Sequence, residues 1–152
     1  SLPQPGTHIK ASRMDAIVVE QKLESLRRCL HRIATKCPAD PELLEVDFDL
    51  QDIVSLNLSR AVQLCVDIGA HLIAGMDTPP PETMGQTFDI LAQAGVLPVD
   101  LALSLKKAVG FRNIAVHNYN AINWLIVHRI AHQHLADFTA FARVVSQRLT
   151  GG

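Results

Sequence analysis

The chain has 152 residues, of which 48% are hydrophobic and 19% charged, and its formal net charge at pH 7 is −1. This length is that of one ordinary domain, and the apolar content is enough for a buried core, which excludes a disordered chain. The near-neutral charge excludes a globally basic nucleic-acid binder, so any nucleic-acid site must be local. Aromatic residues make up only 5%, and the dominance of aliphatic residues favours an all-α fold.

Cysteine usage and hydropathy bear on the cellular compartment. Cys29, Cys37 and Cys65 include no C-x-x-C pair, so they indicate reduced thiols instead of a disulfide framework or a zinc motif. No uninterrupted apolar run reaches the ~18 residues of a membrane-spanning helix, and no secretory signal pattern opens the sequence. These features predict a cytoplasmic protein without a membrane partner. We expect residues 1–14 to be a flexible arm or a non-native remnant, and residues 15–150 to be a single helical domain.

The spacing of apolar residues predicts about five helices. In chain order they are expected over residues 15–36, 50–74, 82–94, from 98 toward 111, and 123–149. Asp15 is the expected N-cap of the first helix, and the acidic stretch 38–52 is expected to be mostly a solvated loop. The predicted architecture is a small bundle of two long antiparallel helices with shorter helices packed across them.

One segment near residue 115 concentrates polar side chains. Its candidate functional residues are Lys106, Lys107, Arg112, Asn113, His117 and Tyr119. Arginine offers a planar fork of donors to a phosphate, and neutral histidine exchanges protons near pH 7, so the grouping suggests phosphate chemistry. The alternative is that an isolated Arg or His at a helix end has a structural role.

Helical geometry limits how these residues cooperate. Asn113 and His117 share a face, whereas Arg112 and His117 lie about 140° apart around an ideal helix. One helix therefore presents a shallow polar arc that does not enclose a substrate. A second copy related by a two-fold axis would complete a cleft, so the spacing favours a homodimer.

Arg112, His117 and Tyr119 match an R-x4-H-x-Y signature, and through it the sequence resembles the HepT-like toxins of the HEPN superfamily. Four further stretches resemble this family in the same order, namely residues 22–30, 50–58, 67–73 and 94–97. The resemblance covers about residues 15–126. It implies a small α-helical ribonuclease toxin that is encoded beside a minimal nucleotidyltransferase antitoxin of the MntA type.

The resemblance also implies roles for single residues. Arg112 and His117 become the catalytic pair, Asn113 the polar partner beside Arg112, and Tyr119 the acceptor of AMP from the antitoxin. The expected reaction is metal-independent cleavage of RNA to a 2′,3′-cyclic phosphate and a 5′-hydroxyl. The alternative is a non-catalytic nucleotide- or RNA-binding adaptor, in which the same residues only hold a phosphate, or a structural adaptor that works through its dimer face.

Two pairs of residues outside the motif have helical spacing. Asp67 and His71 are expected either as a buried or interfacial hydrogen-bonded pair or as support for the dimer cleft. His128 and His132 share a helical face, but Arg129 stands where the zincin pattern requires Glu, so no metal site is predicted. The absence of a Gly-rich phosphate loop and of a carboxylate pair for magnesium predicts no cofactor.

The first predicted helix is locally basic. Its basic residues are Lys22, Arg27, Arg28, His31, Arg32 and Lys36, partly offset by Glu20 and Glu24. A solvated face is the simplest interpretation. A track for RNA or a surface for an acidic antitoxin is the alternative.

Overall fold

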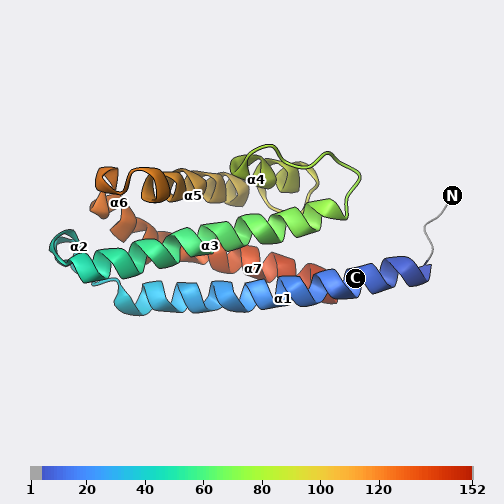
Figure 1. Ribbon diagram of the computed structural model, residues 1–152, viewed down its shortest axis with the longest axis horizontal. Helices are drawn as coiled ribbons and strands as arrows, with labels where there is room; N and C mark the ends of the chain where they lie inside the picture. The colour runs from blue at the N-terminus through green and yellow to red at the C-terminus, as the bar shows by residue number, and fades with distance from the viewer. Residues whose placement is uncertain (1–4, 152) are drawn as a thin grey trace.

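The structure, a computed structural model, describes residues 5–151, with side chains from Asp15 onward. Within this range every regular element is a helix, which confirms the all-α prediction (Figure 1). The elements are α1 (Pro5–Lys36), α2 (Pro41–Val46), α3 (Phe48–Ala74), α4 (Met84–Gln93), α5 (Val99–His117), the 3-10 turn η1 (Tyr119–Ala121), α6 (Trp124–Arg129), the π-helical turn η2 (Ile130–His134) and α7 (Leu135–Thr150).

Helices α1 and α3 are the two long antiparallel helices of the bundle, and they lie side by side along most of their length (Figure 1). The predicted apolar stripes face each other in this pair. Leu26 and Ile33 of α1, and Leu58 and Cys65 of α3, are completely buried. Because burying a leucine or isoleucine side chain stabilises a fold by roughly 1.5–3 kcal/mol, this seam is a main source of stability.

Helices α4 and α5 pack across α3, and α7 closes the bundle from behind (Figure 1). The rings of Phe88 and Phe141 meet edge to face in the core, with centroids 6.2 Å apart. Gly69 allows α4 to approach α3 closely, because a Cβ atom at this position would lie 2.5 Å from Cγ2 of Thr87. The packing of α4 therefore fixes the side of α3 on which α5 lies.

The first helix begins at Pro5 and not at Asp15, so the predicted N-cap lies inside α1. The helix therefore continues through most of the segment predicted as an arm, while residues 1–4 lie outside the described residues. The sequence does not reveal this extension because residues 5–14 carry no periodic apolar face.

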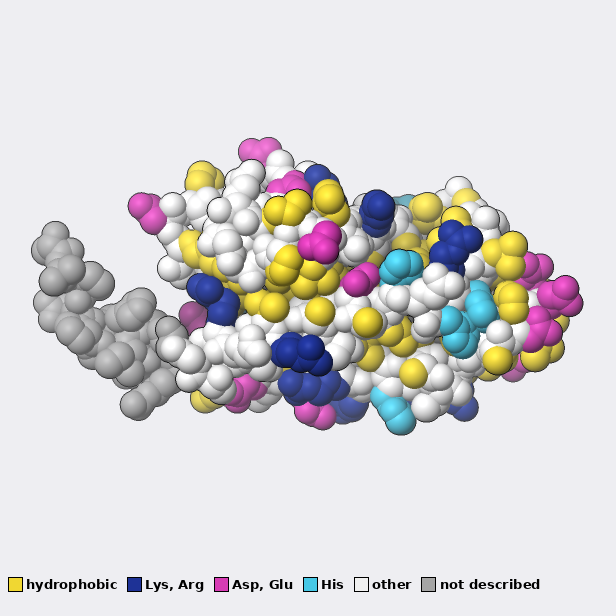
Figure 2. All heavy atoms as spheres, turned by 180° about the vertical axis from the view of Figure 1, so that it is seen from behind, with side chains coloured by type: hydrophobic (Ala, Val, Ile, Leu, Met, Phe, Trp, Pro, Cys, Tyr) yellow, Lys and Arg dark blue, Asp and Glu magenta, His cyan; other side chains and the backbone are white. Residues whose placement is uncertain are grey.

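The acidic stretch predicted as a loop contains the short helix α2. Asp40 caps it by accepting a 2.9 Å hydrogen bond from the backbone N–H of Glu42, and Pro41 occupies its first position. Leu44 is completely buried and anchors the helix to the bundle. The acidic side chains gather at this end of the molecule, in magenta in Figure 2.

The last predicted helix is divided into α6, η2 and α7 by a π-helical turn. Asn123 caps its start by accepting a 3.0 Å hydrogen bond from the N–H of Leu125, as the predicted boundary requires. The interruption at η2 was not predicted, because the apolar stripe continues on both sides of it with Val127, Ala131 and Phe138 buried.

One helix in the described part of the chain, α3, is long and apolar enough to cross a membrane by length and composition. The sequence analysis found no such run because Arg60 and Asp67 interrupt it. In the structure 56% of the most apolar window of α3 is buried inside the bundle. This burial is typical of a core helix.

Candidate active site

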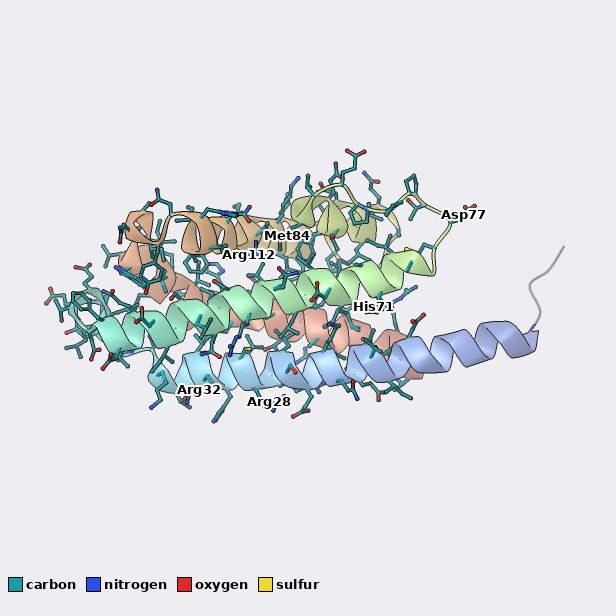
Figure 3. The ribbon with its side chains drawn as sticks, viewed as in Figure 1. Arg28, Arg32, His71, Asp77, Met84 and Arg112 are labelled. Atoms are coloured by element: carbon teal, nitrogen blue, oxygen red, sulfur yellow. The ribbon has the colours of Figure 1, made fainter. Side chains whose placement is uncertain are left out.

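The C-terminal half of α5 carries two residues of the signature, Arg112 and His117, and the third, Tyr119, begins η1. Leu105 and Val109 bury one face of α5 in the core. Arg112 continues this face and is partly buried, so that its aliphatic stem lies on the bundle while its guanidinium reaches the surface. Figure 3 shows Arg112 on α5, in the layer above α3.

The guanidinium of Arg112 has one weak partner among the described side chains. Its Nη1 donates a 3.5 Å hydrogen bond to Oδ1 of Asn113. His117 is the exposed last residue of α5. No hydrogen bond joins it to Arg112 in the described part of the chain.

Tyr119 is held from two sides. Its hydroxyl donates a 2.6 Å hydrogen bond to Oδ1 of Asp52 on α3. Its ring contacts the ring of Trp124 edge to face, with centroids 5.7 Å apart. Tyr119 as a whole remains 38% exposed.

These surroundings perturb the hydroxyl of Tyr119. Partial burial raises its pKa above 10.0, the hydrogen bond to Asp52 and the negative charge of Asp52 raise it further, and Ser55 partly offsets the rise. Tyr119 is therefore a neutral donor near pH 7. Its conversion to a nucleophile requires a base, and the carboxylate of Asp52 is already in contact with the proton.

The two lysines beside the signature, Lys106 and Lys107, have different surroundings. Lys106 forms a 2.9 Å ion pair with Asp89 on α4, so its charge stabilises the contact between α4 and α5. Lys107 is exposed and lines a hollow beside α6 with Arg129. Of these two candidate functional residues, only Lys107 is without an ion pair among the described residues.

Within the described part of one chain, Asp67 and His71 do not form a hydrogen-bonded pair with each other. Asp67 accepts a 2.9 Å hydrogen bond from Gln63 and forms a 3.7 Å ion pair with Lys22 of α1. His71 is labelled on the far half of α3 in Figure 3. At a rise of 1.5 Å per residue it lies about 28 Å along α3 from Asp52, the partner of Tyr119, so within one chain it does not support the tyrosine end of the site.

Most of the basic residues of α1 line a groove between this helix and α3. This groove has a volume of about 860 Å³ and contains four arginines, Arg27, Arg28, Arg32 and Arg60. Asn57 also lines it, and its side-chain amide donates a 2.8 Å hydrogen bond to the carbonyl of Ile53. The groove concentrates positive charge on a chain whose net charge is nearly zero.

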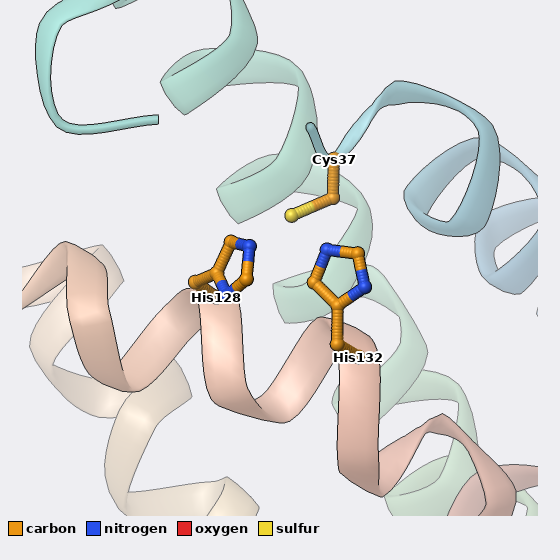
Figure 4. Close-up of side chains that lie close together, drawn as sticks. All are labelled: Cys37, His128 and His132. Atoms are coloured by element: carbon orange, nitrogen blue, oxygen red, sulfur yellow. The ribbon is translucent and has the colours of Figure 1, made fainter. Parts of the chain in front are cut away.

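A second group of polar residues joins distant parts of the chain. Cys37 follows α1, and its thiol lies beside the imidazoles of His128 on α6 and His132 on η2 (Figure 4). The sequence places the two histidines on one helical face but does not reveal Cys37, because only tertiary packing brings this residue to them. His134, the third histidine of this stretch, forms a 3.4 Å contact with Asp137 instead.

Comparison with protein families gives a match over most of the chain. Residues 19–145 match the family model described as "Ribonuclease HepT-like". The chain is 37% identical over 128 residues to a Shewanella oneidensis protein named "mRNA nuclease HepT", and the match covers 84% of this chain and 96% of that protein.

Solved structures give the same result. A toxin–antitoxin complex with AMP-PNP contains a chain that superposes with a TM-score of 0.80 at 36% identity, covering 85% of this chain and 97% of that one. A tri-AMPylated HEPN toxin from Shewanella oneidensis, in complex with its MNT antitoxin, superposes with a TM-score of 0.79 at 36% identity, covering 85% and 96%. The fold and the sequence match therefore extend over the same large part of the chain.

Proposed function

Since the chain belongs to the HepT-like ribonuclease family, we propose that it is the ribonuclease toxin of a toxin–antitoxin pair and that Arg112 and His117 cleave its RNA substrate. The observation that carries this proposal is the placement of Arg112, His117 and Tyr119 on one continuous surface segment at the end of α5. The arginine offers a fork of donors, the histidine a proton carrier, and the tyrosine a site for control.

In the proposed reaction the 2′-hydroxyl of the RNA attacks the adjacent phosphorus. His117 takes the proton of this hydroxyl, the new bond to the 2′-oxygen forms, and the bond to the 5′-oxygen breaks. The departing oxygen receives a proton from an imidazolium, and the products are a 2′,3′-cyclic phosphate and a 5′-hydroxyl. Arg112 stabilises the negative charge that develops on the phosphoryl oxygens. No step in this sequence uses a metal ion.

We propose that the active form is a homodimer. In one chain Arg112 and His117 lie on an open polar surface. A second surface is needed to exclude water from a substrate bound there. Large apolar residues surround this polar surface without being buried: Ile114 is 44% exposed and Val116 is 53% exposed. A two-fold related copy that covers these residues would bring two arcs together over one RNA strand.

Control by a nucleotidyltransferase antitoxin of the MntA type would act at Tyr119. A relative of 36% identity is described as tri-AMPylated and bound to its MNT antitoxin, which supports such a partner here. An AMP ester on Tyr119 would add bulk and negative charge where the RNA backbone passes, and its phosphate could occupy the guanidinium fork of Arg112. RNA and antitoxin would both meet the toxin in the cytoplasm.

The decisive experiment measures cleavage of RNA in EDTA by the wild type and by His117→Ala. We expect cyclic-phosphate ends from the wild type and a loss of about 100-fold or more in the variant, as for a general acid–base residue. His134→Ala is the matched control, because it removes an exposed histidine from another element.

The outcomes separate the alternatives. Equal cleavage by His117→Ala would remove His117 from the mechanism, and loss of wild-type cleavage in the chelator would contradict the metal-independent reaction. Retained RNA binding without turnover by the wild type would favour the non-catalytic adaptor.

A further inference from the structure

We propose that Cys37, His128 and His132 form a binding site for a divalent transition-metal ion of the Zn²⁺ type. One sulfur and two imidazole nitrogens, one from each residue, lie within 4.8 Å of one another. In Figure 4 the sulfur and one nitrogen of each ring turn toward a common point. None of the three residues lies on α5, so this site is separate from the proposed ribonuclease residues.

The chemistry of the three side chains suits a borderline-soft cation. Thiolate and imidazole are the ligands that Zn²⁺ takes in proteins, at about 2.3 Å for sulfur and about 2.0 Å for nitrogen. With these bond lengths and tetrahedral angles, the ligand atoms would lie roughly 3.3–3.7 Å from one another. The three ligand atoms, all within 4.8 Å of one another, would have to move closer together to reach this range when an ion binds.

The carbonyl oxygen of Pro38 completes the cluster. The Nε2 atoms of His128 and His132 each lie 2.9 Å from this oxygen. Nε2 of His128 also lies 3.0 Å from the carbonyl oxygen of Ala39. The two ring nitrogens thus face the same small volume beside the backbone carbonyls that follow Cys37. When both nitrogens lose their protons, their lone pairs converge there, and a cation takes the place of the two protons. The oxygen, or a water molecule, supplies the fourth ligand.

The backbone holds the ligands before any ion binds. The N–H of Cys37 donates a 2.9 Å hydrogen bond to the carbonyl of Ile33, which fixes the residue at the end of α1. His128 and His132 lie on either side of the start of η2, and their ring centroids are 4.1 Å apart. Such π-helical turns are concentrated at functional sites because they re-aim side chains.

The surroundings attract cations. The neighbouring α2 end of the molecule carries exposed carboxylates, among them Asp40, Glu42 and Glu45. Figure 2 shows histidine side chains on the surface next to this acidic end. The negative field raises the local concentration of divalent ions. A bound ion would connect the junction of α1 and α2 to the α6–η2 turn, and would therefore stabilise the end of the bundle that also holds Asp52 and Trp124.

The test uses untagged full-length protein that has been stripped with EDTA and dialysed, with Co²⁺ and then Zn²⁺ as probes. We expect one Co²⁺ per chain, with a thiolate-to-cobalt charge-transfer band and the intense visible bands of tetrahedral cobalt, both removed when Zn²⁺ displaces the ion. Zn²⁺ should also raise the Tm of the wild type, because it binds only the folded state.

The variants identify the ligands. Cys37→Ser should remove the charge-transfer band. His128→Ala and His132→Ala should each weaken Co²⁺ binding by about tenfold or more, because even the loss of a residue that only hydrogen-bonds to a metal ligand has an effect of this size. Cys29→Ser and His134→Ala are the matched controls, one a buried cysteine and the other an exposed histidine of the same stretch, and both should bind like the wild type.

Three results would overturn the proposal: no uptake of Co²⁺ by folded wild type, an octahedral spectrum without the sulfur band, or the same band in Cys37→Ser. Circular dichroism of every variant shows whether it is folded, and the small change in Cys37→Ser keeps the test valid if a histidine variant does not fold. The readout is metal binding, so it is independent of RNA cleavage.

Discussion

The hydroxyl of Tyr119 donates a 2.6 Å hydrogen bond to the carboxylate of Asp52, a residue 67 positions earlier in the chain. This bond connects the segment that follows the signature histidine to the second turn of α3. It presents the only tyrosine of the sequence in one orientation, with its ring against Trp124. The acidic composition of the segment around Asp52 does not reveal this contact.

The first prediction concerns the pKa of Tyr119. Because the hydrogen bond and negative charge of Asp52 raise this pKa, Asp52→Asn should lower it toward its ordinary value, while burial keeps part of the rise. Tyrosinate absorbance measured against pH reports Tyr119 alone, since the chain has one tyrosine. Asp49→Asn, an exposed carboxylate of the same helix, should leave the titration unchanged. An identical curve for Asp52→Asn would contradict the contact.

The second prediction concerns modification by the antitoxin. After co-expression with an MntA-like nucleotidyltransferase, the wild type should gain one or more AMP units by mass spectrometry and lose ribonuclease activity. Tyr119→Phe should gain none and stay active, and Asp52→Ala should be modified more slowly because its tyrosine is no longer oriented. AMP found on Tyr119→Phe would show that the acceptor lies elsewhere. Full activity of a modified wild type would exclude silencing.

The third prediction concerns the dimer. Val116→Asp places a charge on the apolar surface beside His117, so sedimentation should show a monomer. RNA cleavage should fall as well, because a second copy of the chain no longer completes the cleft. Val46→Asp is the control, because Val46 is 71% exposed on α2, outside α5. A fully dimeric Val116→Asp protein would place the interface elsewhere.

The fourth prediction concerns the core. Phe141 is completely buried against Phe88, and Phe141→Ala should lower the free energy of unfolding by about 3–5 kcal/mol. Phe48 is 74% exposed, so Phe48→Ala should change the free energy of unfolding by no more than about 0.5 kcal/mol. Urea denaturation measures both. Similar values for the two variants would contradict the assigned burial.

The fifth prediction concerns the arginine groove between α1 and α3. If RNA follows it, Arg28→Glu and Arg32→Glu should weaken RNA binding and reduce the salt slope by about 0.7 for each lost phosphate contact. Arg148→Glu on α7 makes the same charge change outside the groove and should have a smaller effect. Unchanged RNA affinity together with weaker antitoxin binding would assign the groove to the antitoxin.

The sequence by itself determined the helical class, most helix ends and the family. Periodic apolar residues, caps such as Asn123 and breaks such as Gly95-Val96-Leu97-Pro98 act within a few positions, so they are readable without a structure. The signature residues Arg112, His117 and Tyr119 are likewise close in sequence, and their exposed arc follows from helical spacing alone. The short helix α2 was not predicted, because its capping residue and its few apolar residues lie within a stretch whose acidic composition is typical of a loop.

Only the tertiary structure decided which side chains meet across the bundle. Asp67 contacts Lys22 instead of His71, Lys106 contacts Asp89, and Asp52 accepts a hydrogen bond from the hydroxyl of Tyr119. Cys37 reaches two histidines about ninety positions away, at a turn where the helix widens. Helical periodicity fixes the face on which a residue lies, but its partner depends on how the helices slide and rotate against one another, and that is set by core packing over the whole chain.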